Sequence, residues 1–573
     1  FFVGPSPSAS TNTRIVMPVS SSRRNDTWSA TLESSSAGTM TVSINIPVNA
    51  SIGPYKITAQ ITSAGRTSTN DVGRCSVLFN AWASGDEAYM SNDAERKEYV
   101  LNETGLVFYG SAGFPSSSAW DYGHFEDGVV DICFKLLQES PEYKADPATH
   151  ISKCNDPVYI SRILSAMVNS QDDRGVIVGN WSGDYSGGEN PSSWSGSVAL
   201  LQRWSQSGPV RYGQCWVYAG VLCTTLRCLG LAARLITNFE SAHDTNNNLI
   251  IEQYLDAYGR SIGSPDSVWN FHAWVECWFR RKDLGSTYDG WQILDATPQE
   301  PSGGSYRLGP TSQKAVKLGD VNLPFDGPFV LAEVNADEIY YGRRNDGTFS
   351  ILYTDTRKVG QYISTKAVGN FSRQDVTDQY KFPEENGITS DQNVDLLRHM
   401  LFCVVNNDVR LMSMNIPSLI FKLSGELQVG QDFTVTLNLK NPTSSKKQVN
   451  AKWTLTAIVY NRTPVKEILS DSQSVTLAPN EEESVNLTVE YSKYQGALTP
   501  DNMIQVVAVC EEENGAALLT DTVITLKNPP MQLKVPDKAA VNKALSVEVI
   551  FQNTIGDRLK NCLITLEGSG LIK

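Results

Sequence analysis

Signals for a membrane or a nucleic acid are missing from this sequence of 573 residues. No apolar run approaches the roughly 18 residues that a membrane-spanning helix needs, and no signal peptide is visible. Basic residues are in deficit, since 48 lysines and arginines face 62 acidic residues and leave a formal charge of −14. Because nucleic-acid phosphates are bound by basic surfaces, the negative net charge argues against a nucleic-acid partner. An acidic surface is better suited to binding cations.

Zinc-binding and disulfide patterns are missing too. Ten cysteines are an ordinary number for this length, and none forms a CxxC pair or a zinc-ligand spacing. Cys133, Cys223 and Cys403 lie in apolar segments, where buried reduced thiols are expected. We therefore expect a reducing compartment, the cytoplasm. The chain starts with FFVGPSP, without an initiator methionine, so export or anchoring through an upstream segment and membrane association stay open.

A chain of 573 residues is longer than one hydrophobic core usually supports, so several domains are expected. The pattern of apolar and polar residues also changes along the chain. Residues 1–82 alternate apolar and polar side chains, which predicts an N-terminal β-sandwich. Residues 83–400 mix helical periodicity with aromatic strands and hold all five histidines, which indicates an α+β domain. Alternation then returns, and residues 415–527 and 528–573 predict two more all-β domains, the second cut short.

One cysteine stands at an expected helix start. Cys215 in RYGQCWVYAG follows a turn at Gly213 and precedes an apolar run at helical spacing that ends at Gly230. A helix N-terminus and a neighbouring imidazolium lower a thiol pKa from about 8.5 to roughly 3.5–7.5. The pattern alone leaves two interpretations, a nucleophile or, more commonly, a core thiol at the start of a helix.

Two residues further along are candidate partners for such a nucleophile. His272 in WNFHAWVECW shares one strand face with Trp274, while Phe271 and Ala273 lie on the other. Asp295 ends the apolar strand GWQILDATP, where a carboxylate can accept a ring N–H and fix the imidazole tautomer. The alternatives are a structural histidine and an aspartate in a turn.

Four segments, YGQCWV, SAHD, WNFHAW and GWQILDATPQE, closely resemble the animal transglutaminases in this order and spacing, nearest to the epidermal and tissue types. DPVYISRILSAMVNS, PFVLAEVNAD and YISTKAVG match as well, so the resemblance covers nearly the whole chain. It implies a multidomain α+β fold. A papain-like core would be flanked by an N-terminal β-sandwich and two C-terminal immunoglobulin-like β-barrels, with both ends truncated.

The resemblance also assigns a reaction and the residues that carry it. Cys215 is similar to the family nucleophile, His272 to its general base and acid, and Asp295 to the residue that orients the histidine. The implied activity is calcium-dependent acyl transfer from protein-bound glutamine to lysine or other primary amines through a thioester, with deamidation as a side reaction. The implied partners are glutamine-donor proteins, lysine-donor proteins and small primary amines.

Three aromatic residues gain roles from the same resemblance. Trp181 in GNWSGDY matches an oxyanion donor that acts beside the Cys215 backbone N–H, and it forms the wall of an acyl-acceptor tunnel with Trp269. Tyr460 in AIVYNRT matches a tyrosine that gates the nucleophile in the resting state. Without the resemblance, Trp181 is interpreted as a core or surface aromatic and Tyr460 as a β-strand aromatic.

Calcium sites are implied in three places. DTNNNLI offers oxygens at alternate positions like an EF-hand, but Leu249 replaces the glycine at position 6 and Leu255 the glutamate at position 12, so an EF-hand is excluded. A plain hydrophilic loop is the alternative, and Asn246 stands for a family carboxylate, which weakens affinity. The first implied site consists of Asp244, Asn246, Asn248, the Ile250 carbonyl and Asp266. The second consists of the Ala166 and Gln171 carbonyls, Asn169 and Asp173. The third consists of Asn335, the Thr356 carbonyl and Glu384.

Guanine-nucleotide control, which some relatives use, is not expected. Their lysine-phenylalanine pair appears here as Gly113 and Phe114, and a cation for the phosphates is lost. Two other functions remain open, a papain-like cysteine protease and a catalytically silent structural member of the same fold. An intact Cys215, His272 and Asp295 argue against the silent member. The tryptophans, calcium loops and trailing β-domains have no part in protease chemistry.

Overall fold

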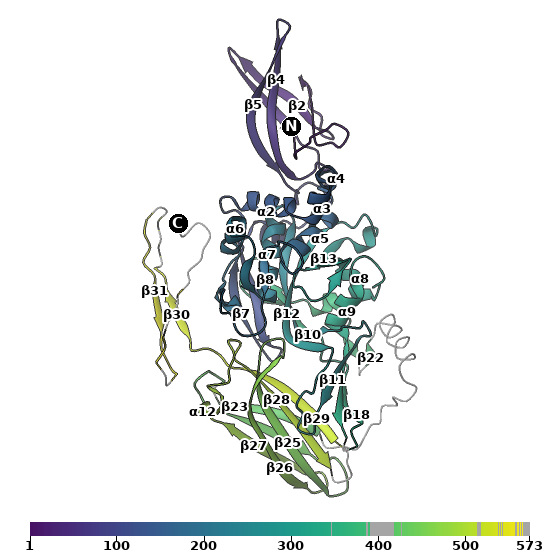
Figure 1. Cartoon of the computed structure of the whole chain (residues 1–573), viewed down its shortest axis with the longest axis vertical. Helices are drawn as coiled ribbons and strands as arrows, with labels where there is room; N and C mark the ends of the chain where they lie inside the picture. Colours follow the sequence, from purple (N-terminus) through teal and green to yellow (C-terminus); the bar gives the residue numbers. More distant parts are fainter. Residues whose placement is uncertain are drawn as a thin grey trace.

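The structure is a computed structural model that describes the chain except residues 345, 386–387, 390–417, 426, 513–516, 537, 539, 541–542, 556–557, 561, 563 and 565–573. The described part is elongated, with the N-terminal strands at one end, a mixed helix-and-sheet domain in the middle and the strands of residues 418–525 at the other end (Figure 1). The strands of residues 531–551 lie to one side, beside the central domain (Figure 1). Within these residues, no helix combines the length and the apolar character that a membrane crossing requires. The predicted boundary between 400 and 415 lies outside the described residues.

The N-terminal region forms a three-stranded sheet, β1-β2-β3, and a long hairpin of β4 and β5. Its strands are β1 Val19–Ser20, β2 Ser29–Ser36, β3 Thr39–Asn45, β4 Gly53–Ser63 and β5 Arg66–Val77. A small core of Phe1, Val3, Tyr55 and Val77 includes Ile151, which belongs to the helix α4 (Pro147–Lys153). This contact seats the N-terminal strands on the central domain.

The central domain is built on an antiparallel sheet of order β16-β13-β12-β10-β19-β20. The residues of β12 point alternately to two buried faces, because Phe271 and Ala273 join the hydrophobic cluster around α7, whereas Trp274 joins the one that contains α9. The face division read from the sequence is therefore confirmed. Both faces are covered, which explains why β12 is apolar almost throughout.

The remaining elements of the central domain surround this sheet (Figure 1). Its helices are α1 Asp93–Arg96, α2 Val129–Gln138, α3 Pro141–Ala145, α4, α5 Pro157–Met167, α6 Val198–Ser207, α7 Cys215–Cys228, α8 Gln313–Leu318, α9 Gly327–Asn335 and α10 Thr377–Tyr380. Its strands are β6 Thr104–Ser111, β7 Phe114–Asp121, β8 Ile177–Gly179, β9 Val210–Gly213, β10 Ala232–His243, β11 Ile250–Leu255, β12 Ser267–Phe279, β13 Gly290–Asp295, β14 Pro301–Ser302, β15 Ser305–Tyr306, β16 Leu308–Ser312, β17 Asp337–Arg343, β18 Phe349–Asp355, β19 Gln361–Lys366, β20 Arg373–Asp375, β21 Glu384–Glu385 and β22 Ile388–Thr389. Short turns of helix occur at η1 Lys97–Leu101, η2 Pro191–Ser193 and η3 Ser286–Tyr288.

Helix α7 begins at Cys215 and is followed by Gly230, as its sequence predicts. The expected turn at Gly213 is wrong, because this residue ends strand β9. Glycine is required there by close packing, since a Cβ would lie 2.5 Å from Cγ2 of Ile177. Gly230 adopts a φ of 89°, a conformation that favours glycine, and it stops the helix. The helix packs against β10 and β12, which brings its N-terminus to the sheet.

The C-terminal region contains two open sheets, β23-β24-β27 and β26-β25-β28-β29, and a separate pair, β30-β31. Its elements are β23 Ser418–Gly425, β24 Phe433–Lys440, β25 Lys447–Ile458, β26 Pro464–Leu477, β27 Glu482–Val489, α12 Tyr491–Tyr494, β28 Met503–Glu512, β29 Ala517–Thr525, β30 Met531–Lys534 and β31 Glu548–Phe551. The described strands thus form an immunoglobulin-like sandwich and close no barrel. Alternating side chains cannot distinguish the two, because closure depends on pairing between edge strands.

Buried charges join the sandwich to the central domain. Lys358 lies 3.1 Å from Glu338 and 2.9 Å from Asp521, which comes from β29. Arg462, in the loop after β25, pairs with Glu240 on β10 and donates to the side chain of Asn270 at 3.0 Å. Because a buried charge is costly without a partner, these contacts fix the loop that carries Tyr460 against the central sheet.

Candidate active site

His272 and Asp295 form a buried pair at the middle of the central sheet. They come from the neighbouring strands β12 and β13, and Nε2 of His272 lies 2.7 Å from Oδ2 of Asp295, with both side chains at most 2% exposed. Burial acts to lower the pKa of His272. The charge and hydrogen bond of Asp295, with a contribution from Cys215, outweigh it and raise that pKa well above its usual value. The imidazole therefore gains a proton readily.

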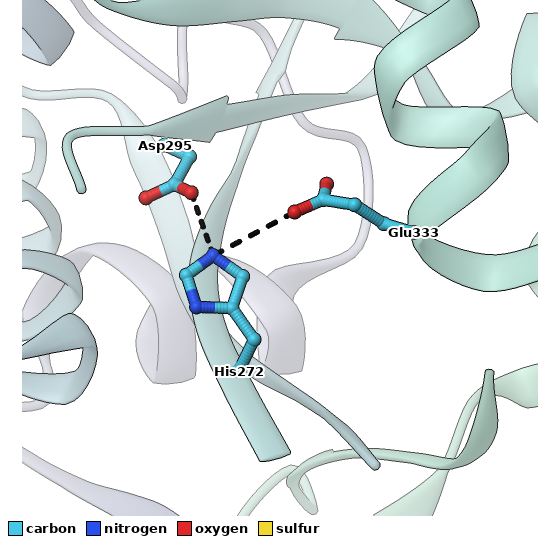
Figure 2. A group of neighbouring side chains, drawn as sticks. All are labelled: His272, Asp295 and Glu333. Atoms are coloured by element: carbon cyan, nitrogen blue, oxygen red, sulfur yellow. Dashed lines mark hydrogen bonds and ion pairs between the residues drawn. The ribbon is translucent and has the colours of Figure 1, made fainter. Parts of the chain in front are cut away.

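Cys215 is fully buried at the first position of α7. Nδ1 of His272 is buried and finds no hydrogen-bond partner among the described residues, and Figure 2 shows it on the side of the ring away from Asp295. The influence of Cys215 on the His272 pKa places the thiol beside the imidazole. The thiol thus stands at the N-terminus of a fourteen-residue helix and next to the imidazole.

The hydroxyl oxygen of Tyr460 lies where two N–H groups converge. It accepts a hydrogen bond from Nε1 of Trp181 at 2.7 Å and another from the backbone N–H of Cys215 at 3.4 Å. Burial and the neighbouring Cys215 raise the pKa of Tyr460 well above its usual value, so the phenol stays neutral. An oxygen beside the thiol thus faces two donors that carry no competing lone pair.

Aromatic rings enclose this oxygen. The Tyr460 ring stands perpendicular to that of Trp269, with centroids 5.7 Å apart, and packs on Phe271 at 4.7 Å. Trp269 is 8% exposed and also lies edge-on to His272 at 5.1 Å. Trp181 stacks on Tyr218 at 6.4 Å. The structure therefore brings Trp181, Trp269 and Tyr460 together around Cys215, and Tyr460 fills the space between the two tryptophans.

Glu333 and Gln299 also belong to the site, and no inference from the sequence had included them. Oε1 of Glu333 lies 3.7 Å from Nε2 of His272, so both carboxyls approach the same ring nitrogen (Figure 2). Burial raises the pKa of Glu333 to about 8. Nε2 of Gln299 lies 3.1 Å from Oδ2 of Asp295 and 3.0 Å from Oε1 of Glu333. A lone glutamate in the apolar helix PFVLAEVNAD was the available signal, because buried carboxylates need partners.

The loop between β10 and β11, together with Asp266 just before β12, provides the oxygen-rich donor set of the first expected calcium site. Asp244 accepts from the backbone N–H groups of Asn246 and Leu249 at 3.0 and 2.8 Å, and burial, with a contribution from Asp266, raises its pKa. Oδ2 of Asp266 is buried and has no hydrogen-bond partner among the described residues. Asn248 caps the loop by accepting from the N–H of Ile250 at 2.7 Å. Two buried carboxylates, one of which has an oxygen without a partner among the described residues, fit a hard cation.

The second expected site follows α5. Asn169 is fully buried, and its side chain accepts from the N–H of Gln171 at 3.0 Å, while Asp173 accepts from that of Gly175 at 2.6 Å. Burial raises the pKa of Asp173 to about 6. Ala166 lies within the same turn, since the N–H of Asn169 donates to its carbonyl at 3.2 Å. This loop also supplies only oxygen donors, which suits calcium.

The third expected site is only partly described. Asn335 is buried at the end of α9, and Thr356 is half-buried directly after β18. The side chain of Glu384 lies outside the described residues, as does that of Phe114. Within the described part of the chain, the one group of three His, Cys, Asp or Glu residues whose ligand atoms come within 4.8 Å is His272, Asp295 and Glu333. A site that includes an imidazole does not suit calcium, which prefers oxygen ligands.

Comparison with known proteins agrees with this geometry. Three family profiles match the chain: "Transglutaminase family" over residues 1–62, "Transglutaminase-like superfamily" over 181–296, and "Transglutaminase family, C-terminal ig like domain" over 417–513 and 529–573. Cattle protein-glutamine gamma-glutamyltransferase E is 45% identical, over 99% of this chain and 84% of its own. Human protein-glutamine gamma-glutamyltransferase 6 is 42% identical, over 100% of this chain and 84% of its own.

A solved structure shows the same relationship in three dimensions. Red sea bream transglutaminase superimposes with a TM-score of 0.83 at 34% identity, covering 93% of this chain and 79% of its own. The likeness therefore extends from the N-terminal strands through the central domain to the immunoglobulin-like strands. The chain belongs to the transglutaminase family of enzymes.

Proposed function

We propose that the protein transfers the acyl group of protein-bound glutamine to lysine or other primary amines through a thioester on Cys215, and that it requires calcium. The observation that carries this proposal is the position of the Tyr460 hydroxyl. Its oxygen lies beside the nucleophile and accepts from both Trp181 Nε1 and the Cys215 N–H, at 2.7 and 3.4 Å. An oxyanion formed at Cys215 needs such a pair of donors, so the Tyr460 oxygen occupies its place in the resting enzyme.

In the first half-reaction, the Cys215 thiolate attacks the carboxamide carbon of glutamine. Negative charge develops on the carboxamide oxygen, where Trp181 and the Cys215 N–H donate to it. His272 gives its proton to the departing nitrogen, the C–N bond breaks, and ammonia leaves behind a thioester. The raised pKa of His272 keeps that proton available near neutral pH.

In the second half-reaction, the amine attacks the thioester carbon and His272 takes its proton. The C–S bond breaks and an isopeptide is released, so the thiolate and the imidazolium are restored together. Water in place of the amine gives deamidation. The enclosure by Trp181 and Trp269 favours an uncharged amine over water, because apolar walls disfavour both water and the ammonium form.

We propose that calcium binds mainly at the first two sites, whose ligand residues are all described. One contains Asp244 and Asp266, and the other contains Asn169 and Asp173. Bound there, the ion would supply positive charge that offsets the buried carboxylates. The proposed regulatory consequence is withdrawal of Tyr460 from the donors. We place Asn335, Thr356 and Glu384 as a third, weaker site.

The proposal is tested by monodansylcadaverine incorporation into casein, measured with calcium and with excess chelator. We expect fluorescent, high-molecular-weight casein with calcium only. A papain-like protease would instead shorten casein, and a silent structural member would leave it unchanged. Either result would reject the proposal, and full activity in chelator would reject its calcium requirement.

The oxyanion role of Trp181 predicts a large loss in the Trp181→Phe variant. We expect kcat for amine incorporation to fall by about 10² to 10³, because one of two donors is removed and phenylalanine offers none. The rate of Cys215 alkylation by iodoacetamide should not fall, since that reaction forms no oxyanion. Trp453→Phe, in the sandwich, serves as the matched control. Unchanged turnover in Trp181→Phe would exclude this residue from the mechanism.

The gating role of Tyr460 predicts the opposite effect in calcium-free enzyme. Tyr460→Phe removes the two hydrogen bonds at the hydroxyl, each contributing about 0.5–1.5 kcal/mol, so alkylation of Cys215 should accelerate roughly tenfold. Tyr494→Phe, which loses a buried hydroxyl bonded to the Gln431 carbonyl, controls for general loosening of the sandwich. An alkylation rate equal to that of the native enzyme would show that the hydroxyl does not restrain access.

A further inference from the structure

We infer that Glu333 is a positioning residue, which acts through Gln299 to hold Asp295 against Nε2 of His272. This inference rests on the proposed function, because it assigns a support to the residues that carry out the transfer. Neither residue is needed as an acid or a base. What the role requires is an acceptor oxygen at the place of Oε1 of Glu333.

The hydrogen bonds define one chain of contacts. The amide nitrogen of Gln299 reaches Oδ2 of Asp295 at 3.1 Å and Oε1 of Glu333 at 3.0 Å. A primary amide has two hydrogens, so it can serve both acceptors at once. Oδ1 of Asp295 accepts from the backbone N–H of Thr297 at 2.8 Å. Both oxygens of Asp295 are therefore held, one by backbone and one by Gln299.

Glu333 is the fixed end of this series of hydrogen bonds. It lies within α9 and is 1% exposed, and its backbone carbonyl accepts from the side chain of Asn238 on β10 at 2.8 Å. Figure 2 shows its carboxyl directed from the helix at the same imidazole nitrogen that Asp295 contacts from the strand. A carboxyl that is anchored by a packed helix has little freedom, so it can fix a more mobile partner.

Gln299 is the partner that Glu333 holds. It is half-buried and borders a cavity of about 390 Å³, whose lining also includes Thr297 and Glu300. On its other side, Gln299 covers Asp295. Without an acceptor at Glu333, the amide can turn toward the cavity and admit water to Asp295. Water beside the pair weakens the attraction between Asp295 and the imidazolium, because the effective dielectric rises.

The experiment compares Glu333→Met, Glu333→Gln, Gln299→Ala and the double variant Glu333→Met with Gln299→Ala. For Glu333→Met we expect kcat to fall about tenfold with KM for the glutamine donor unchanged, since only orientation of the reacting groups is lost. The rise of the Cys215 alkylation rate with pH should move to higher pH, because a less firmly held imidazolium stabilises the thiolate less. Gln299→Ala should match it, and the double variant should add no further loss.

Glu333→Gln is the rescue. It retains an oxygen for Gln299 at the same place, and we expect it to recover activity to within about threefold of the native enzyme. A loss in Glu333→Gln as large as in Glu333→Met would overturn the inference, as would additive losses in the double variant or an unmoved alkylation profile. Alkylation needs no glutamine or amine. Failure of the transfer reaction would therefore be seen separately from failure of this positioning role.

Discussion

Replacing Cys215 by alanine is expected to abolish amine incorporation, with kcat reduced on the order of 10⁶-fold, as when a nucleophile is removed from a working catalytic unit. The physical reason is that no other described group can take its place. Cys215 combines the N-terminus of α7 with contact to an imidazole whose pKa is raised. Alanine preserves the helix start, so folding should be little affected.

The matched control is Cys223→Ala, two turns further along the same helix. Cys223 is fully buried, and burial raises its pKa, which keeps it a thiol. We expect this variant to lose a little thermal stability and to retain amine incorporation. Substantial turnover in Cys215→Ala, at equal protein concentration and with casein as donor, would show that another group forms the covalent intermediate.

The second large effect is expected for Asp295→Asn, with kcat lower by about 10⁴. The native carboxylate accepts the Nε2–H of His272 at 2.7 Å, which leaves Nδ1 to serve the thiol. An asparagine amide can instead donate a hydrogen bond to Nε2 of His272. This bond stabilises the imidazole tautomer that has its proton on Nδ1. Such an imidazole cannot accept a proton from Cys215 or from the attacking amine.

The same substitution has a defined pH signature. Burial lowers the His272 pKa and the charge of Asp295 raises it, so removing that charge leaves burial dominant and the pKa falls. The imidazolium is populated only below this pKa. A thiolate beside a neutral imidazole lacks this stabilisation, so the rise of the Cys215 alkylation rate with pH should shift to higher pH in Asp295→Asn. An unchanged profile together with native kcat would show that Asp295 does not act on the histidine.

Local features of the site could be predicted from the sequence because they depend on neighbouring residues. Gly230 marks the end of α7 through its backbone conformation, and Cys215 begins the helix as expected. The two faces of β12 follow from alternation, which places Trp274 apart from Phe271. The pairing of Cys215, His272 and Asp295 needed the family resemblance, since spacing alone does not bring a helix start to two strands.

Other features depend on contacts that spacing does not encode. Trp181 and Tyr460 are 279 positions apart, and their hydrogen bond exists only because the sandwich docks on the central domain. Glu333 reaches the site from α9, on the second face of the sheet. The open sandwich, in place of the expected barrel, is decided by edge pairing that alternation does not specify.

The central claim, a thioester on Cys215, is tested most directly by trapping it. The calcium-loaded enzyme is mixed with a glutamine-containing peptide in the absence of amine, quenched in acid within one turnover, digested and measured by mass spectrometry. We predict that the fragment containing Cys215 gains the mass of the peptide minus one ammonia, and that hydroxylamine removes this adduct. Ammonia release at the native rate with the adduct on a different residue, or with no adduct, would contradict the account.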